Sequence, residues 1–437
     1  MIDFLTSIGI DPITIVIVIV MSTIVFILLY RKFVFNIFDP LNLFIISLVA
    51  NSAIMFSLPW DLQLKWEYAA YTLALWIGFS LSSRHQSPGA SRTLQFNKSL
   101  LFDLQVVLVL LFMIIVTGNL YLGASTGFPM LSSNPSQSKV TSYTGGLGLV
   151  RRLNTGPYLF FCCGCVYLAA IRHKRRFVLT LLLISTGFIM LSGSKGALLP
   201  LIYTQAFVLA HPGLKKNSAL TTRVKKYISF TLLFGVVVAL TVTVKDTGSI
   251  SGGVLAFFKR ILLTGDVIMF YFADRVHIMA LTDQTLAGYL KYLFNDTLGM
   301  LRVGEYQEAL GSVILGGENG FGPNVQYFVR ADLFFGPVYG FFYSLGIGYF
   351  IGYLRTSFLH VSKASPMMFT LRLVFAVSAF TLAIESSLFV SEATSIVVLV
   401  FPLWIIARLI RSGSTAARNR PSHEPIVRAD LPQAYPG

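Results

Sequence analysis

Residues suited to acid–base chemistry are concentrated in one part of this 437-residue chain: nine of its 19 acidic residues fall between Lys245 and Asp332. A carboxylate or a neutral imidazole can take a proton from a hydroxyl group. The candidates for this role are Asp266, Asp274, His277, Glu305, Glu308, Glu318 and Asp332. Asp274 and His277 are three residues apart and would be neighbours on a helix, where a solvated ion pair is the alternative to an oriented base.

Basic residues in the segments expected to lie outside the membrane suit an anionic ligand. They are Arg151, Arg152, Lys195, Lys259, Arg260, Arg275, Lys291, Arg302 and Arg330. Arginine presents a planar fork of donors that matches phosphate oxygens. Several such groups at a bilayer surface would bind a lipid-linked diphosphate; the alternatives are pairing with loop acids or contact with lipid headgroups. Lys195 follows Gly193 in a short turn that would bind an anion or form an ordinary hairpin.

The elements that must position these groups are apolar helices. Hydrophobic residues make up 55% of the chain and charged residues 12%. Apolar runs of about 17–25 residues are long enough to cross a hydrocarbon core, and they lack the alternation of barrel strands. The sequence therefore predicts an all-α integral membrane protein with about 11 transmembrane helices. We expect them at residues 12–30, 41–59, 67–83, 99–117, 155–171, 177–193, 197–211, 227–244, 334–354, 367–388 and 393–410.

The net charge of +15 is distributed as membrane topology requires, with its basic clusters between the predicted spans. Because loops kept in the cytoplasm are enriched in Lys and Arg, we expect the N-terminus outside and the C-terminus inside, and no nucleic-acid partner. Residues 1–244 then hold eight spans and a periplasmic loop near 118–154. Residues 245–333 form a large periplasmic loop of two or three short surface helices, the expected active site. Residues 334–410 hold the last three spans, and residues 411–437 a disordered cytoplasmic tail.

Several signatures of other enzyme classes do not occur. The chain has no Asp-x-Asp pair, no His-Glu-x-x-His, no phosphate-binding loop ending in Lys-Ser/Thr and no nucleophile elbow. Cys162, Cys163 and Cys165 lie in one apolar run without nearby metal ligands, so we expect them to be packing residues. These patterns disfavour a metal-dependent or nucleotide-using enzyme, and we expect neither a metal nor a cofactor.

Four local features give the chain a resemblance to a known family. Ser192-Gly193-Ser194-Lys195-Gly196 is similar to a Gly-Ser-Arg/Lys-Gly turn, and Arg260 to Asp266 is similar to an Arg…Gly-Asp stretch early in the long loop. Gly322-Pro323-Asn324, followed by residues 335–340, is similar to the exit from that loop, and Arg330 precedes Gly346 by 16 residues. With about a dozen spans and two outer loops, the chain resembles the Wzy family of bacterial O-antigen and capsule repeat-unit polymerases.

The resemblance implies glycosyl transfer between undecaprenyl-diphosphate-linked oligosaccharides at the periplasmic face of the inner membrane, with a chain-length regulator as a partner. Lys195, Arg260, Arg302 and Arg330 would bind the departing diphosphate, and Arg151 or Arg152 the second lipid. Asp266, then His277 and Glu305, are the preferred bases for the acceptor hydroxyl. Two alternatives stay open: an O-antigen ligase, and a flippase or other transporter, although the predicted spans contain few ionisable residues.

Overall fold

This computed structural model describes residues 12–83, 98–133, 156–192, 198–212, 235–262, 266–301, 324–361 and 365–418, with residues 135, 138, 150, 154 and 233. Within them the fold is all-α and contains no strand, as the apolar runs predict. Five of the described helices are long and apolar enough to cross a membrane, so the predicted count of eleven is not confirmed. These five are Ile13–Phe33, Pro40–Ser57, Leu100–Thr126, Tyr327–Leu359 and Ser386–Gly413.

The described helices are named in chain order. In the first half they are α2 (Pro12–Tyr30), η1 (Arg31–Phe33), α3 (Pro40–Ser57), α4 (Leu62–Ser83), α5 (Lys98–Thr126), η2 (Pro129–Leu131), α8 (Tyr158–Ala170), α9 (Arg175–Leu191) and α10 (Leu199–Ala210). In the second half they are α13 (Ile250–Leu262), α14 (Asp266–Ala273), α15 (Arg275–Leu281), α16 (Leu286–Leu301), α18 (Tyr327–Arg330), η4 (Ala331–Phe335), α19 (Gly336–Leu359), α20 (Pro366–Ser378), α21 (Thr381–Ile384), α22 (Ser386–Ser395), η5 (Ile396–Val400) and α23 (Phe401–Arg418).

Helices α4 and α19 pack with their backbones in close contact. A Cβ atom added at Gly78 would overlap the carbonyl oxygen of Leu345, and one added at Gly348 would overlap that of Leu75. Small residues allow two helix backbones to approach closely. Within lipid the resulting van der Waals contact drives helix association, because no hydrophobic effect acts between helices there. This contact fixes α19, and with it the polar segment that immediately precedes α19.

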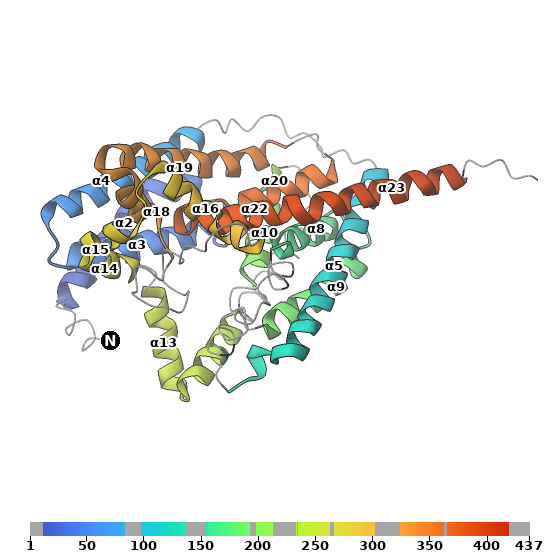
Figure 1. Ribbon diagram of the computed structural model, residues 1–437, viewed down its shortest axis with the longest axis horizontal. Helices are drawn as coiled ribbons and strands as arrows, with labels where there is room; N and C mark the ends of the chain where they lie inside the picture. The colour runs from blue at the N-terminus through green and yellow to red at the C-terminus, as the bar shows by residue number, and fades with distance from the viewer. Residues whose placement is uncertain are drawn as a thin grey trace, which may run out of the picture.

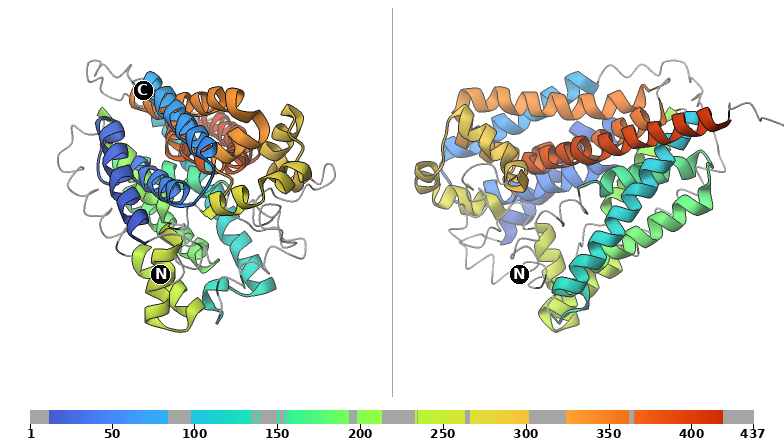
Figure 2. Two further views of the ribbon diagram at one scale, coloured as in Figure 1. Left: turned by 90° about the vertical axis from the view of Figure 1, so that its left-hand side faces the viewer. Right: turned by 45° about the vertical axis from the view of Figure 1, so that its right-hand side comes forward.

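The buried apolar residues form two main clusters. One joins α2, α3 and α4 to α14, α16, α18 and α19, and the other joins α5, α8, α9, α10, α20 and α23. Figure 1 shows α19 and α23 running along the long axis of the molecule, while α5 and α9 cross it obliquely; the right-hand view of Figure 2 shows the same oblique pair. The charged groups described below are neighbours in sequence or contact partners of residues in the first cluster, among them Tyr271, Tyr292 and Val325.

Two ion pairs join segments that the charge pattern places on the cytoplasmic side. Arg355, near the end of α19, makes two hydrogen bonds of 2.8 and 2.9 Å to Asp39, which also caps the start of α3. Arg411 on α23 lies 2.9 Å from Asp103 on α5. Each pair therefore joins two helix ends that are both predicted to lie on the cytoplasmic side. The orientation of the chain across the membrane stays a prediction.

Two expectations about local structure are corrected. The chain was expected to reverse between the predicted spans 367–388 and 393–410, but it reverses near Glu385, and residues 389–392 belong to α22. The reversal lies there because hydrogen bonds from other segments hold Glu385 in place. The window 245–333 contains more than two or three short helices: α13, α14, α15, α16 and α18 all lie in its described part. Tyr271 and Tyr289, on α14 and α16, are buried in the first cluster rather than lying on a surface.

Candidate functional site

The guanidinium of Arg330 is the centre of a buried polar cluster between α16, α18, α19 and the reversal at Glu385. Arg330 is 0% exposed. Its Nε donates to the Tyr343 hydroxyl at 3.0 Å and its Nη1 to the Val325 carbonyl at 2.6 Å. Its Nη2 donates to the carbonyls of Leu382 at 2.5 Å and Ala383 at 3.2 Å. The donors of the fork are therefore occupied by protein acceptors.

The position of Arg330 follows from local backbone structure. It ends α18, and residues 331–335 then form a π-helical turn. Such turns are rare in proteins, and many of those that occur lie at functional sites. Gly336, with φ 65°, follows this turn in a conformation that glycine adopts without strain, and Pro337 occupies the first turn of α19. The wide turn redirects the chain into the long helix and leaves Arg330 and Asp332 facing different partners.

Glu385 is the acidic partner of Arg330. It lies between α21 and α22 with an extended backbone, and Arg330 Nη1 is 4.0 Å from its carboxylate. The Val325 amide donates to the same carboxylate at 2.7 Å and the Ser387 hydroxyl at 3.0 Å, and the Tyr292 hydroxyl also donates to it. A helix reversal exposes backbone carbonyls, and here Arg330 supplies donors for those of Leu382 and Ala383. The pair thus stabilises the reversal.

A second buried carboxylate, Asp332, pairs with Arg275 on α15. Arg275 Nε and Nη2 donate to the two carboxylate oxygens at 2.8 and 2.6 Å, and Tyr271 donates to one of them at 2.6 Å. The Asp332 side chain is 2% exposed and that of Arg275 30%. Burial lowers the pKa of Arg275, but its hydrogen bonds and charge interaction with Asp332 raise the pKa by more, so the guanidinium is charged at any working pH.

Burial also raises the pKa of the Tyr271 and Tyr292 phenols, and the nearby carboxylates of Asp332 and Glu385 raise it further. Both phenols therefore stay protonated and act as hydrogen-bond donors. Tyr289 and Tyr292 on α16 pack against Phe334, and Phe335 stacks on Tyr343. This aromatic layer keeps water away from the Arg330–Glu385 pair, which strengthens its electrostatic interaction.

Two side chains of the predicted site can be placed in the structure. Arg330 is buried as described, and His277 is exposed on α15, two residues after Arg275. No ion pair joins His277 to Asp274, although both lie in the described part of α14–α15. Asp266 begins α14 and Arg260 lies in α13, but their side chains are outside the described residues, as are the residues Arg151, Arg152, Lys195, Arg302 and Glu305. The predicted convergence of these groups stays a prediction.

Asp332 was a candidate base and Arg275 a candidate cation in the sequence, but a buried cluster that joins them to Tyr292, Arg330 and Glu385 was not predicted. Asp332 and Arg275 are 57 residues apart, and Tyr292 and Glu385 are 93 apart, so nothing in the sequence pairs them. A signal was present for two of them: Asp332 is two residues from Arg330, and Glu385 is a carboxylate near the end of an apolar run, where burial is costly. Within the described ranges, no group of three or more His, Cys, Asp and Glu side chains is arranged to hold a metal ion.

Comparison of the chain with protein-family models, curated proteins and solved structures finds no match. The resemblance to the Wzy polymerases therefore depends on the motifs in the sequence alone.

Proposed function

We propose that the protein polymerises undecaprenyl-diphosphate-linked oligosaccharide repeat units at the periplasmic face of the bacterial inner membrane. The observation that carries the proposal is the buried cluster of Arg330, Glu385, Arg275 and Asp332. Ionisable residues at membrane depth are expensive and mark functional sites. These four join the acidic loop window to the last spans, so they fix the position of the loop in which the chemistry is proposed.

The proposed reaction is a direct glycosyl transfer without a metal. The acceptor hydroxyl attacks the anomeric carbon of the donor sugar, the bond from that carbon to the diphosphate oxygen breaks, and its electron pair leaves with the lipid diphosphate. A base takes the hydroxyl proton, for which Asp266, His277 and Glu305 are the candidates. Negative charge grows on the departing diphosphate, so cations already in place lower the barrier.

The cations divide into two roles in this proposal. Lys195, Arg260 and Arg302 bind the departing diphosphate, with Arg151 or Arg152 on the second lipid. Arg330, whose donors already have protein acceptors, holds the reversal at Glu385 and positions the α18–α19 segment. Arg275 is half-buried at the edge of the cluster, with 30% of its side chain exposed.

A surface-polysaccharide gel from a deletion strain tests the proposal, in a host that makes lipopolysaccharide. Loss of a polymerase leaves flipping and ligation intact, so the expected product is lipid A core with one repeat unit. A strain that shows only naked core would contradict the proposal and favour a ligase or a flippase. Re-expression of the intact chain must restore the ladder for either result to count.

A further inference from the structure

The ion pair of Arg275 and Asp332 is the part of the buried cluster that reaches the protein surface. The Arg275 side chain is 30% exposed, whereas that of Arg330 is 0% exposed. Arg275 Nε and Nη2 donate side by side to the two oxygens of Asp332, so the pair uses two of the three guanidinium nitrogens. Arginine has five N–H donors in a rigid fork. The ion pair therefore fixes the orientation of the fork without needing the donors of Nη1.

An indole ring lies beside the residues that orient Asp332. Trp60, in the connection between α3 and α4, is half-buried, and its ring centroid lies 6.3 Å from that of Phe272. Phe272 in turn contacts the ring of Tyr271, whose hydroxyl donates to Asp332. The indole N–H of Trp60 has no acceptor in the described chain. Figure 1 shows α14 and α15 at the same end of the molecule as the α3–α4 connection.

Glu67, near the start of α4, belongs to the same neighbourhood. The charges of Asp332, Glu67 and Arg275 all act on the hydroxyl of Tyr71, which lies one turn further along α4. Glu67 is half-buried, and one of its carboxylate oxygens accepts a hydrogen bond of 2.8 Å from Gln63. Its other oxygen, Oε2, has no donor in the described chain. Glu67 therefore adds an acceptor to the donors of Arg275 and Trp60.

The charges of this group do not favour an anionic ligand. One guanidinium, that of Arg275, is already paired with the carboxylate of Asp332, and Glu67 supplies a second carboxylate. A diphosphate would meet repulsion from the second carboxylate. A hydroxyl group, which both donates and accepts hydrogen bonds, suits such a mixture of donors and acceptors.

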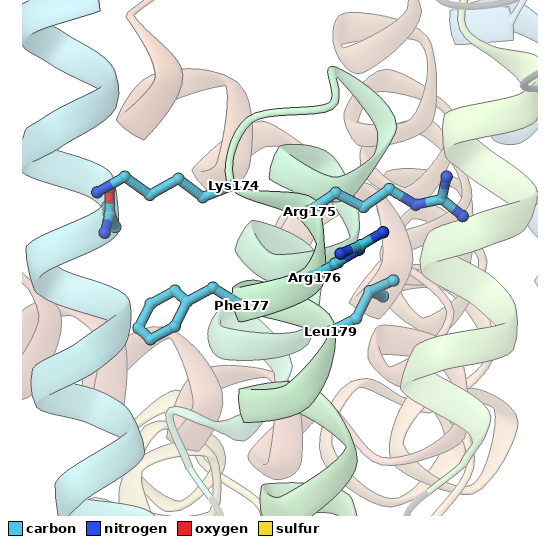
Figure 3. Close-up of a pocket in the computed structure, with 6 residues that line it drawn as sticks. Lys174, Arg175, Arg176, Phe177 and Leu179 are labelled. Atoms are coloured by element: carbon cyan, nitrogen blue, oxygen red, sulfur yellow. The ribbon is translucent and has the colours of Figure 1, made fainter.

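The cations beside the turn between α8 and α9 are arranged differently. A surface cavity of about 890 Å³ there is lined by Gln105, Lys174, Arg175, Arg176, Phe177 and Leu179. Figure 3 shows Lys174 extending to one side of the start of α9, and Arg175 and Arg176 to the other. These three cations do not converge on one ligand. Around Arg275, by contrast, a fixed donor, an acceptor and an aromatic ring occur in one neighbourhood.

We propose that Arg275, Glu67 and Trp60 bind an uncharged sugar ring of the repeat unit, a role that rests on the proposed function. Arg275 donates to a sugar hydroxyl, Glu67 accepts from one, and the indole of Trp60 covers the apolar C–H face of the ring. The diphosphate stays with the cations already assigned to it. A site that hydrogen-bonds a hydroxyl group discriminates strongly against a sugar that lacks it, so this subsite would select the glycan.

The test measures binding of the lipid-free repeat-unit oligosaccharide to the purified full-length protein by titration calorimetry. This probe carries neither lipid nor diphosphate, so its binding does not depend on the diphosphate-binding cations. Arg275→Lys keeps a positive charge beside Asp332 but loses the planar fork. Glu67→Ala removes the acceptor and leaves the ion pair intact. Each variant loses a hydrogen bond to a charged group, and its affinity for the oligosaccharide should fall about 10- to 100-fold.

Arg411→Lys is the matched control. The side chains of Arg411 and Asp103 are 29% and 2% exposed, against 30% and 2% for Arg275 and Asp332. The two lysine variants should lower the unfolding temperature by similar amounts, but only Arg275→Lys should bind the oligosaccharide more weakly. Its affinity for inorganic diphosphate should equal that of the unmodified protein. Equal weakening in both lysine variants, weaker binding of diphosphate alone, or no oligosaccharide binding by the unmodified protein would each overturn the proposal.

Failure of the subsite and failure of the proposed function give different results. Oligosaccharide binding that depends on Arg275 and Glu67, without any ladder from a lipid-linked repeat unit, would support the subsite and contradict the polymerase. Equal ladders from the unmodified protein, Arg275→Lys and Glu67→Ala, with equal oligosaccharide affinities, would support the polymerase and overturn the subsite.

Discussion

Replacing Arg330 with methionine, which keeps most of the side-chain volume, tests the role of the buried cluster. The change removes the hydrogen bonds to Tyr343, Val325, Leu382 and Ala383, together with a longer one of 3.5 Å to the Tyr292 hydroxyl, and it leaves Glu385 without its cation. The four shorter hydrogen bonds, at about 0.6 kcal/mol each as for side-chain hydrogen bonds in membrane proteins, set a lower bound of about 2 kcal/mol. Breaking one side of a buried ion pair costs about 3–5 kcal/mol. The unfolding free energy should therefore fall by about 2–5 kcal/mol.

The assay is denaturant unfolding of the purified protein in mild detergent, followed by tryptophan fluorescence. Arg330→Lys retains the charge but loses the planar fork, so its loss should lie between those of the methionine variant and the unmodified protein. Combining Arg330→Met with Glu385→Gln removes both charges, and the combined loss should be at least about 1 kcal/mol smaller than the sum of the single losses. A loss below about 1 kcal/mol for Arg330→Met, or strict additivity, would refute the cluster as a source of stability.

Three further predictions test packing, ionisation and chemistry. Gly348→Ala should destabilise the protein because its Cβ overlaps the Leu75 carbonyl, whereas Gly346→Ala, with nothing within 4 Å, should be neutral in the same unfolding assay; equal effects would contradict the α4–α19 contact. The pKa of Tyr292 is raised in the folded protein above its value of about 10 in the unfolded chain. The contribution of the neutral phenol to stability is therefore complete below about pH 10 and is lost as the pH rises toward the pKa of the folded state. The unmodified protein should thus lose more stability than Tyr292→Phe between about pH 9 and 11, and parallel curves would argue against the raised pKa. Arg260→Ala and Arg302→Ala should each reduce polymer formation about 10²- to 10³-fold with the unfolding free energy little changed, and full-length polymer in both variants would remove these residues from the mechanism.

Helix positions were predictable because burial in lipid requires long apolar runs. The predicted span at 12–30 coincides with α2, and the predicted spans at 177–193 and 334–354 differ from α9 and α19 by only a few residues at each end. The reversal at Glu385 was misplaced because apolar composition continues through it. Its position depends on donors from Val325 and Arg330, which are distant in sequence.

The candidate site was predictable as a region rather than as a set of contacts. The clustering of acidic residues placed Asp332 among the candidate bases, and the cost of burying a carboxylate in an apolar run is a signal that applies to Glu385. Neither signal identifies Arg275 as the partner of Asp332 or Tyr292 as a donor to Glu385, because those pairs form only when α15 and α16 pack against α18–α22. Arg330 was predicted to bind a diphosphate, and its burial among protein acceptors was not apparent from its charge.

Polymerisation by the purified protein is the most direct test of the central proposal. The protein would be incubated with an undecaprenyl-diphosphate-linked repeat unit as both donor and acceptor, in the presence of a metal chelator and without any sugar nucleotide. The account predicts a ladder of lipid-linked products spaced by one repeat unit, with release of undecaprenyl diphosphate at each step. No ladder under these conditions, with a ladder restored by adding Mg²⁺ or a sugar nucleotide, would contradict it.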